Sequence, residues 1–287
     1  MQNVVEVSGL NKAYPNFALK DLTFSLPEDC ITGFIGTNGA GKTTTLRTIL
    51  ALAKKDSGRI HLFGKDISQA ERAIKDRLGV VLDGDCFFDH LSMMDMKSII
   101  APAYSRWDEK CFRGYMERFD LNPRQKISSL SKGMRVKFAL ALALSHNADL
   151  LIMDEPTSGL DPLIRSQLLD IMADYMRPGG KSVFFSTHIT SDLDKVADML
   201  ILIDRGEIVF EREKDALLES HRLVKGESRM LTEELRRLFV KIQITDFGFS
   251  GITAHPTEVK ARMDSTIMER PSVEDVMLAY IEGGNAK

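Results

Sequence analysis

The sequence predicts an α/β fold, because short apolar runs of strand length alternate with segments of helical spacing along most of the chain. A strand, a glycine-rich turn and a helix follow one another directly over residues 31–52. Further apolar runs lie at 78–82, 150–153 and 182–187. Continuous apolar strands of this kind are typical of a sheet that is covered on both faces by helices.

The glycine-rich turn has the composition of a phosphate-binding loop. Residues 36–43 fit the pattern G-x-x-x-x-G-K-[ST], which arises by chance in roughly one chain in a hundred of this length. Glycine tolerates positive φ, so the turn can direct its N–H groups at a phosphate chain, and the following helix adds partial positive charge. Lys42 would reach the β and γ oxygens, and the Thr43 hydroxyl would ligate Mg²⁺. The nucleotide-binding candidates here are Gly36, Thr37, Asn38, Gly39, Ala40, Gly41, Lys42, Thr43 and Thr44.

The balance of charges argues against nucleic acid as a partner. Thirty-eight Lys and Arg against 41 Asp and Glu leave a net charge of −3, whereas proteins that bind a phosphate backbone are basic. No apolar run approaches the ~20 residues that cross a bilayer, and the N-terminus lacks a signal pattern. Cys30, Cys86 and Cys111 have no metal-site spacing and are expected to be reduced thiols. We therefore expect a cytoplasmic protein, and any membrane-spanning part is another chain.

The segment before the turn predicts strands at 3–8 and 21–26, with Tyr14 in the loop between them. An aromatic ring near a phosphate loop can stack on a purine base. Taken alone, such a tyrosine is more often a packed loop residue.

The middle of the chain predicts helices without strands. After Asp83 a loop leads into a helical segment that continues, with turns, to Phe119. Its methionines and aromatic residues are expected mainly in a core, and the alternative is a soft groove for a partner helix. A second helix, 135–145, follows the sequence LSKGM at 130–134, with Ser131 in the N-cap position.

Acidic residues end the next buried strand. Asp154 and Glu155 follow an apolar run and precede Pro156, so they lie at the carboxyl end of a strand, where ligands of open α/β sheets collect. The turn 158–161 opens another helix, and His188 ends the strand 182–187. We expect His188 at the same sheet edge as the two carboxylates, where it would contact the γ-phosphate.

This ordered set of motifs resembles the nucleotide-binding subunit of an ABC transporter. The corresponding motifs are the aromatic A-loop (Tyr14), Walker A (36–43), the signature (LSKGM for LSGGQ), Walker B with the catalytic glutamate (Asp154 and Glu155), the D-loop (158–161) and the H-switch (His188). The resemblance covers residues 1–215. Residues 216–287 have charged, mixed segments and look similar to the C-terminal extensions of ABC-2-type exporter ATPases, including those of the acetoin-utilisation operon kind.

The resemblance implies the details of the fold. It implies a P-loop NTPase (RecA-like) core with an antiparallel β subdomain, a helical ABC subdomain inserted at about 84–146, and a small C-terminal α/β extension.

The resemblance also implies the partners and the chemistry. Two ATPase subunits, identical or different, would bind ATP head to tail, so that Ser131, Gly133 and Asp161 of one complete the site of the other. Asp154 would hold Mg²⁺, Glu155 would polarise the attacking water and His188 would bind the γ-phosphate. The dimer would lie on the inner face of the cell membrane, bound to permease subunits, and closure on ATP would power transport, in this subgroup export.

Two departures from the family pattern carry charge. Lys132 replaces a glycine of LSGGQ, and Asp83 stands where the family has the Q-loop glutamine, which contacts Mg²⁺ and signals to the membrane subunit. We predict that Asp83 acts through the metal. Two alternative functions remain. A soluble ABC ATPase could act on another macromolecule, but such ATPases usually have two cassettes or a long coiled-coil insertion, and this chain has neither. A metabolic P-loop kinase would not need the LSKGM sequence.

Overall fold

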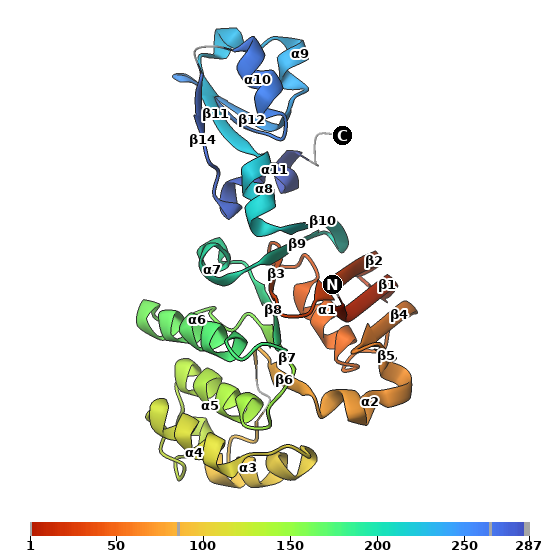
Figure 1. The fold of residues 1–287 in the computed structure, drawn as a ribbon, viewed down its shortest axis with the longest axis vertical. Coiled ribbons are helices and arrows are strands. Elements are labelled where there is room, and N and C mark those ends of the chain that lie inside the picture. Colours follow the sequence, from red (N-terminus) through yellow and green to blue (C-terminus); the bar gives the residue numbers. More distant parts are fainter. Residues whose placement is uncertain (1, 85–86, 264–265, 284–287) are drawn as a thin grey trace.

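The computed structural model describes residues 2–84, 87–263 and 266–283. The described strands form three sheets, and the molecule is elongated (Figure 1). The central sheet lies in the middle, a C-terminal unit lies at one end, and the helices α3, α4 and α5 lie at the other.

The central sheet explains why its strands are apolar along their whole length. Its strand order is β10-β9-β3-β8-β7-β6. The five strands from β9 to β6 are parallel, and β10 joins the edge antiparallel through a hairpin. Every residue of β3, β7 and β8 is buried. The bounds are β3 Ile31–Ile35, β6 Leu78–Val81, β7 Leu150–Asp154, β8 Ser182–Thr187, β9 Met199–Asp204 and β10 Glu207–Glu213.

Alternate side chains of this sheet enter two different cores. Phe184 belongs to the cluster shared with the N-terminal sheet and α1 (Lys42–Ile49). Phe185, the next residue, belongs to the larger cluster on the other face. The larger cluster also holds side chains of α6 (Pro162–Met176) and α7 (Thr190–Val196).

The N-terminal sheet is antiparallel, with strand order β2-β1-β4-β5. Its strands are β1 Asn3–Tyr14, β2 Phe17–Pro27, β4 Ser57–Leu62 and β5 Lys65–Asp66, and α2 (Ile67–Lys75) follows. The prediction that β1 ends at Ser8 and that Tyr14 lies in a loop is wrong. A bulge between Val7 and Leu10, with Gly9 at φ 62°, interrupts the alternation of buried and exposed residues, so the sequence pattern stops before the strand does. Tyr14 is the last residue of β1 and pairs with Phe17.

The middle of the chain is helical, as predicted. It contains α3 (Met93–Ile100), α4 (Glu109–Arg118) and α5 (Lys132–Leu144), with short 3-10 turns at Ala101–Ala103 and Ile127–Ser129. Met93, Met96, Phe112, Met116 and Phe119 are buried in the larger cluster. The prediction that the methionine and aromatic side chains of this segment lie mainly in a core is confirmed for these five residues, whereas Phe88 is 57% exposed. Cys30 and Cys111 are partly buried free thiols, and Cys86 lies outside the described residues.

The C-terminal unit has the chain order β-α-β-β-α-β and the strand order β12-β13-β11-β14 with antiparallel neighbours, which is a ferredoxin-like arrangement. It has a small core of its own, which includes Val224, Phe239 and Phe249. Its elements are β11 Arg222–Gly226, a 3-10 turn Ser228–Met230, α9 Glu233–Arg236, β12 Phe239–Thr245, β13 Gly248–Thr253, α10 Pro256–Arg262 and β14 Ile267–Glu269.

Two helices join this unit to the part of the molecule that contains the central sheet. α8 (Lys214–Ser220) leads into it, and α11 (Val273–Gly283) returns to pack on α7, α8 and the strands β12 and β13 (Figure 1). Val276 and Met277 of α11 belong to the larger core cluster. A boundary near residue 215 stays a prediction, since α8 spans it and α11 contributes to the core on its far side.

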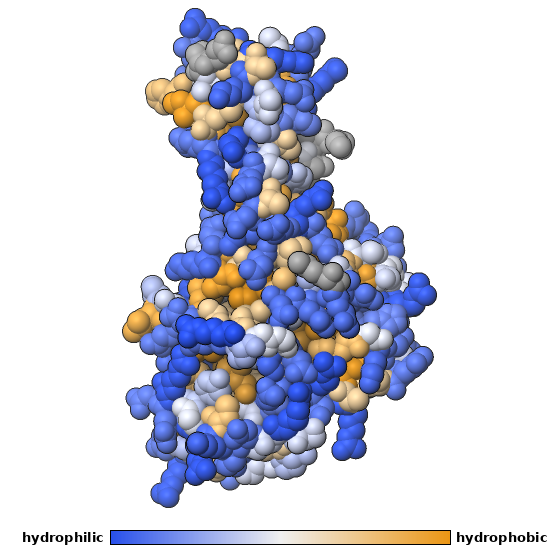
Figure 2. Space-filling model, viewed as in Figure 1, coloured by the Kyte–Doolittle hydropathy of each residue, from blue (hydrophilic) through white to orange (hydrophobic). Residues whose placement is uncertain are grey.

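Figure 2 shows that this face of the molecule is mostly hydrophilic, with apolar side chains gathered at the level of the central sheet and α7. None of the helices within the described ranges is long and apolar enough to cross a membrane.

The joint at α11 can be tested by truncating a buried side chain. We expect Met277→Ala to lower the free energy of unfolding by about 2–4 kcal/mol, because it leaves a cavity against α7 and α8. Leu278→Ala, which changes the exposed neighbour on the same helix, should change it by less than about 0.5 kcal/mol. Urea unfolding followed by circular dichroism measures both, and equal effects would contradict the shared core.

Candidate functional site

The loop between β3 and α1 is shaped to leave backbone donors free. Gly41 is the N-cap of α1 at φ 117°, and no side chain caps the helix. A Cβ at Gly41 would lie 2.8 Å from side-chain atoms of Leu19 and Phe17, so only glycine fits. The first N–H groups of α1 are therefore available to an anion.

Lys42 lies buried at the centre of this loop, with 6% of its side chain exposed. Its Nζ donates to the carbonyl oxygens of Gly36 at 2.7 Å and Thr37 at 3.2 Å. The same Nζ lies 3.1 Å from Oε1 of Glu155. Lys42 thus links the phosphate loop to the end of β7.

The two acidic residues have different surroundings. Asp154 is buried, and its Oδ1 accepts a 2.6 Å hydrogen bond from the Ser186 hydroxyl on β8. The backbone N–H of Glu155 donates to the same hydroxyl oxygen at 2.9 Å. Glu155 has φ 47°, an unfavourable conformation for a non-glycine residue. Its contacts to β8 and Lys42 hold it there.

His188 completes a line of charged and polar groups. Its Nδ1 lies 2.7 Å from Oε2 of Glu155. Lys42 begins α1, whereas Glu155 and His188 follow the ends of β7 and β8. The three residues are connected through the two oxygens of the Glu155 carboxylate, whose side chain is 12% exposed. A carboxylate in this position can accept a proton from water and be oriented by its neighbours.

These groups line an open cleft of about 680 Å³, large enough for a nucleotide. The structure therefore brings together the phosphate loop, Asp83, Glu155 and His188. The lining residues are Asn16, Phe17, Asn38, Gly39, Gly41, Lys42, Thr43, Thr44, Asp83, Glu155, Ser158 and His188.

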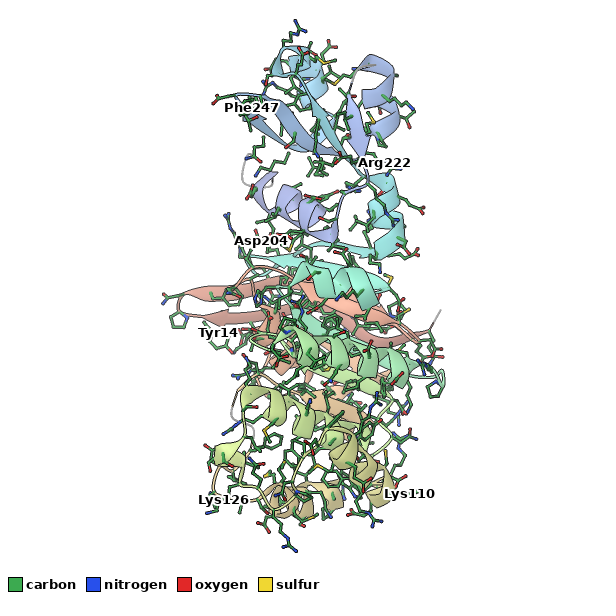
Figure 3. All side chains as sticks on the ribbon, turned by 90° about the vertical axis from the view of Figure 1, so that its left-hand side faces the viewer. Tyr14, Lys110, Lys126, Asp204, Arg222 and Phe247 are labelled. Atoms are coloured by element: carbon green, nitrogen blue, oxygen red, sulfur yellow. The ribbon has the colours of Figure 1, made fainter. Side chains whose placement is uncertain are left out.

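Four predicted site residues belong to the segments that form the cleft but do not line it: Gly36, Thr37, Ala40 and Asp154. Four others lie elsewhere in the described chain. Ser131 caps α5 by accepting from the N–H of Met134, and Gly133 packs near Ile164. Asp161 caps α6 through the N–H groups of Leu163 and Ile164. Tyr14 is 47% exposed at the outer edge of the molecule (Figure 3). Their predicted contacts with nucleotide stay predictions.

Sequence reasoning missed Ser186, Phe17 and Asn16. Ser186 bonds both acidic residues, and its signal was a hydroxyl near the carboxyl end of a fully buried strand. Phe17 lines the cleft because the β1–β2 hairpin is tighter than expected.

The oxygen donors near the cleft fit a Mg²⁺ ion. The Thr43 hydroxyl and the carboxylates of Asp154 and Asp83 are hard oxygen ligands, and no group of three His, Cys, Asp or Glu side chains within the described ranges forms a closed metal site. Mg²⁺ prefers one or two carboxylates plus phosphate oxygens and water, so these residues suit an ion that arrives with a nucleotide.

The fold and this cleft define a P-loop ATPase. Comparisons with known proteins identify which kind. Residues 19–158 match the family model described as ABC transporter. The chain is 30% identical to the Nod factor export ATP-binding protein I of Paraburkholderia xenovorans, over 96% of this chain and 95% of that protein. It is 30% identical to the bacitracin transport ATP-binding protein BcrA of Bacillus licheniformis, over 77% of this chain and 74% of that protein.

A solved structure agrees. The ATP-binding subunit of an ABC transporter superposes with a TM-score of 0.69 at 25% identity, over 75% of this chain and 92% of that one. The chain therefore belongs to the ABC transporter family, as an ATP-binding and ATP-hydrolysing subunit.

Replacing Lys42 tests the cleft. We expect Lys42→Ala to weaken ATP binding about 10- to 100-fold, because a charge-assisted contact to the phosphates is lost. Lys20→Ala, at an exposed lysine on β2, should bind ATP like the unmodified protein. Titration calorimetry measures both, and unchanged binding by Lys42→Ala would refute the assignment of this loop.

Proposed function

We propose that this subunit powers export through separate membrane subunits, using a nucleotide site completed by a second ATPase subunit. The names of its relatives support the direction of transport, since several are Nod factor export proteins. The observation that carries the proposal is the continuous contact from Lys42 through Glu155 to His188 in one cleft.

The second subunit is proposed from the position of the signature. Ser131 and Gly133 are not among the described residues that line the cleft of their own chain. Ser131 and Gly133 would therefore act on nucleotide across an interface, in the site of a second subunit. A head-to-tail pair, of identical or different chains, satisfies this geometry, with Asp161 near the same interface.

Within the cleft, the proposed roles follow from the contacts. The phosphate loop, with Lys42, binds and orients the phosphates. Glu155 accepts a proton from the attacking water, and His188 holds the Glu155 carboxylate in place and faces the γ-phosphate. Asp154, oriented by Ser186, would hold Mg²⁺ together with Thr43. When bound, Mg²⁺ neutralises charge on the β- and γ-phosphates.

Location at the inner face of the cell membrane follows from the proposed permease partners. The alternative is a soluble ABC ATPase acting on another macromolecule. Recovery of this chain from membranes together with a membrane-spanning protein would support transport, and its recovery only in soluble complexes would refute it.

The role of Glu155 can be separated from nucleotide binding. Glu155→Gln keeps the shape of the side chain but cannot accept the proton, so hydrolysis should fall at least about 100-fold while ATP still binds. With Mg-ATP, the variant should remain as a stable dimer in sizing chromatography. Glu207→Gln, at an exposed residue of β10, should hydrolyse ATP normally. A Glu155→Gln variant with normal turnover would exclude the role as base.

The metal role proposed for Asp83 has a direct test. Asp83 pairs with Lys132 in the structure, so it must exchange this partner to approach Mg²⁺. We expect Asp83→Asn to shift the Mg²⁺ concentration at half-maximal ATPase activity upward, because an amide attracts the ion less than a carboxylate. The matched control is Asp89→Asn, since Asp89 is also an exposed carboxylate paired with a residue of α5, Arg135. Identical Mg²⁺ titrations for Asp83→Asn and the unmodified protein would rule the metal role out.

A further inference from the structure

The two charged departures from the family pattern are in contact with each other. Nζ of Lys132 lies 3.2 Å from Oδ1 of Asp83, and the side chains are 46% and 49% exposed. Asp83 follows the end of β6 in the central sheet, and Lys132 is the first residue of α5 in the helical part. The ion pair thus joins two parts of the subunit that are far apart in sequence.

Lys132 does not stabilise α5, the helix that it begins. A cation in the first turn of a helix is opposed by the helix dipole, which favours negative charge at that end. Neither does the pair contribute much to the stability of the fold, because ion pairs this exposed are weak. Because the ion pair between Asp83 and Lys132 is weak, either side chain can readily exchange it for another partner.

The position of the pair connects it to the chemistry. A Cβ at Gly159, in the turn before α6, would lie 3.7 Å from Nζ of Lys132, so the ammonium group lies against that turn. Asp83 and Lys132 line a cleft of about 500 Å³ that Glu155 also lines. Asp83 lies at the border of this cleft and the one that holds Lys42 and Thr43.

We propose that Asp83 and Lys132 form a charge latch, which holds the N-terminal end of α5 beside the catalytic cleft and opens when a nucleoside triphosphate binds. This rests on the proposed placement of the phosphates at Lys42. A polyanion there repels Asp83 and attracts Lys132, so it weakens the pair from both sides. Lys132 lies between Ser131 and Gly133, so its ion pair with Asp83 fixes the position of the turn at 131–133. Asp83 and Lys132 are therefore both positioning residues.

The latch makes a prediction whose sign differs from that of simple electrostatics. Removing a cation near a triphosphate should weaken binding by direct attraction alone. If the latch must open when ATP binds, Lys132→Gln should instead tighten ATP binding, by about two- to fivefold, which is the most that so exposed a pair can supply. Titration calorimetry of ATP with EDTA, which prevents hydrolysis, measures this for the full chain.

Three further variants test the assignment. Lys132→Arg keeps the charge and should bind ATP like the unmodified protein. Lys137→Gln makes the same charge change further along α5 and should have no effect. In an Asp83→Asn background there is no latch to break, so Lys132→Gln should no longer tighten binding.

The outcomes separate this inference from the proposed function. If the unmodified protein binds no ATP, or if Lys42→Ala binds as tightly, the nucleotide site itself is misplaced. If those behave as expected but Lys132→Gln binds ATP equally or more weakly than the unmodified protein, the latch is refuted. Tightening that persists in the Asp83→Asn background would also refute it.

Discussion

The site depends on the register of three parallel strands. Ile35 of β3 pairs with Thr187 of β8, and Ser186 of β8 pairs with Asp154 of β7. The residues that follow these strand ends therefore emerge at one edge of the sheet: Gly36, His188 and Glu155. A slip of one residue would turn side chains to the opposite face and separate the groups. The burial of every residue in these strands prevents such a slip, because each side chain already fills one of two cores.

The site also depends on contacts between oppositely charged and polar side chains within the cleft. Lys42 at the start of α1 and His188 after β8 both contact the carboxylate of Glu155, which follows β7. The Ser186 hydroxyl adds two hydrogen bonds from β8, one to the Asp154 carboxylate and one from the backbone N–H of Glu155. A phosphate chain that contacted Lys42 would compete with Glu155 for the same ammonium group, so one side chain would couple the binding of phosphate to the placement of the Glu155 carboxylate.

The C-terminal unit is connected to this edge through α7. This helix begins two residues after His188, and the hydroxyl of Thr190 donates to Oε2 of Glu274 on α11 at 3.3 Å. On its other side, Arg165 of α6 forms a 2.6 Å ion pair with the buried Asp192 of α7. α7 therefore lies between the helix that follows the D-loop and the last helix of the C-terminal unit.

What the sequence by itself determined is local. Three local patterns were informative: the spacing of Gly36, Gly41 and Lys42, the two acidic residues after one apolar run, and the histidine after another. They can be interpreted from the sequence because the backbone freedom of glycine and the burial of a strand depend on near neighbours in the chain. They were sufficient to predict the α/β core, the helical middle and most of the cleft.

Only the tertiary structure decided the contacts that join distant segments. β1 continues past the bulge at Gly9 to Tyr14, and Ser186 donates a hydrogen bond to Asp154. Side chains of α11 belong to the larger core, and Lys132 forms an ion pair with Asp83. Each of these depends on the register of a sheet or the packing of a helix against residues far along the chain, and periodicity in one segment contains no information about the segment that it will contact.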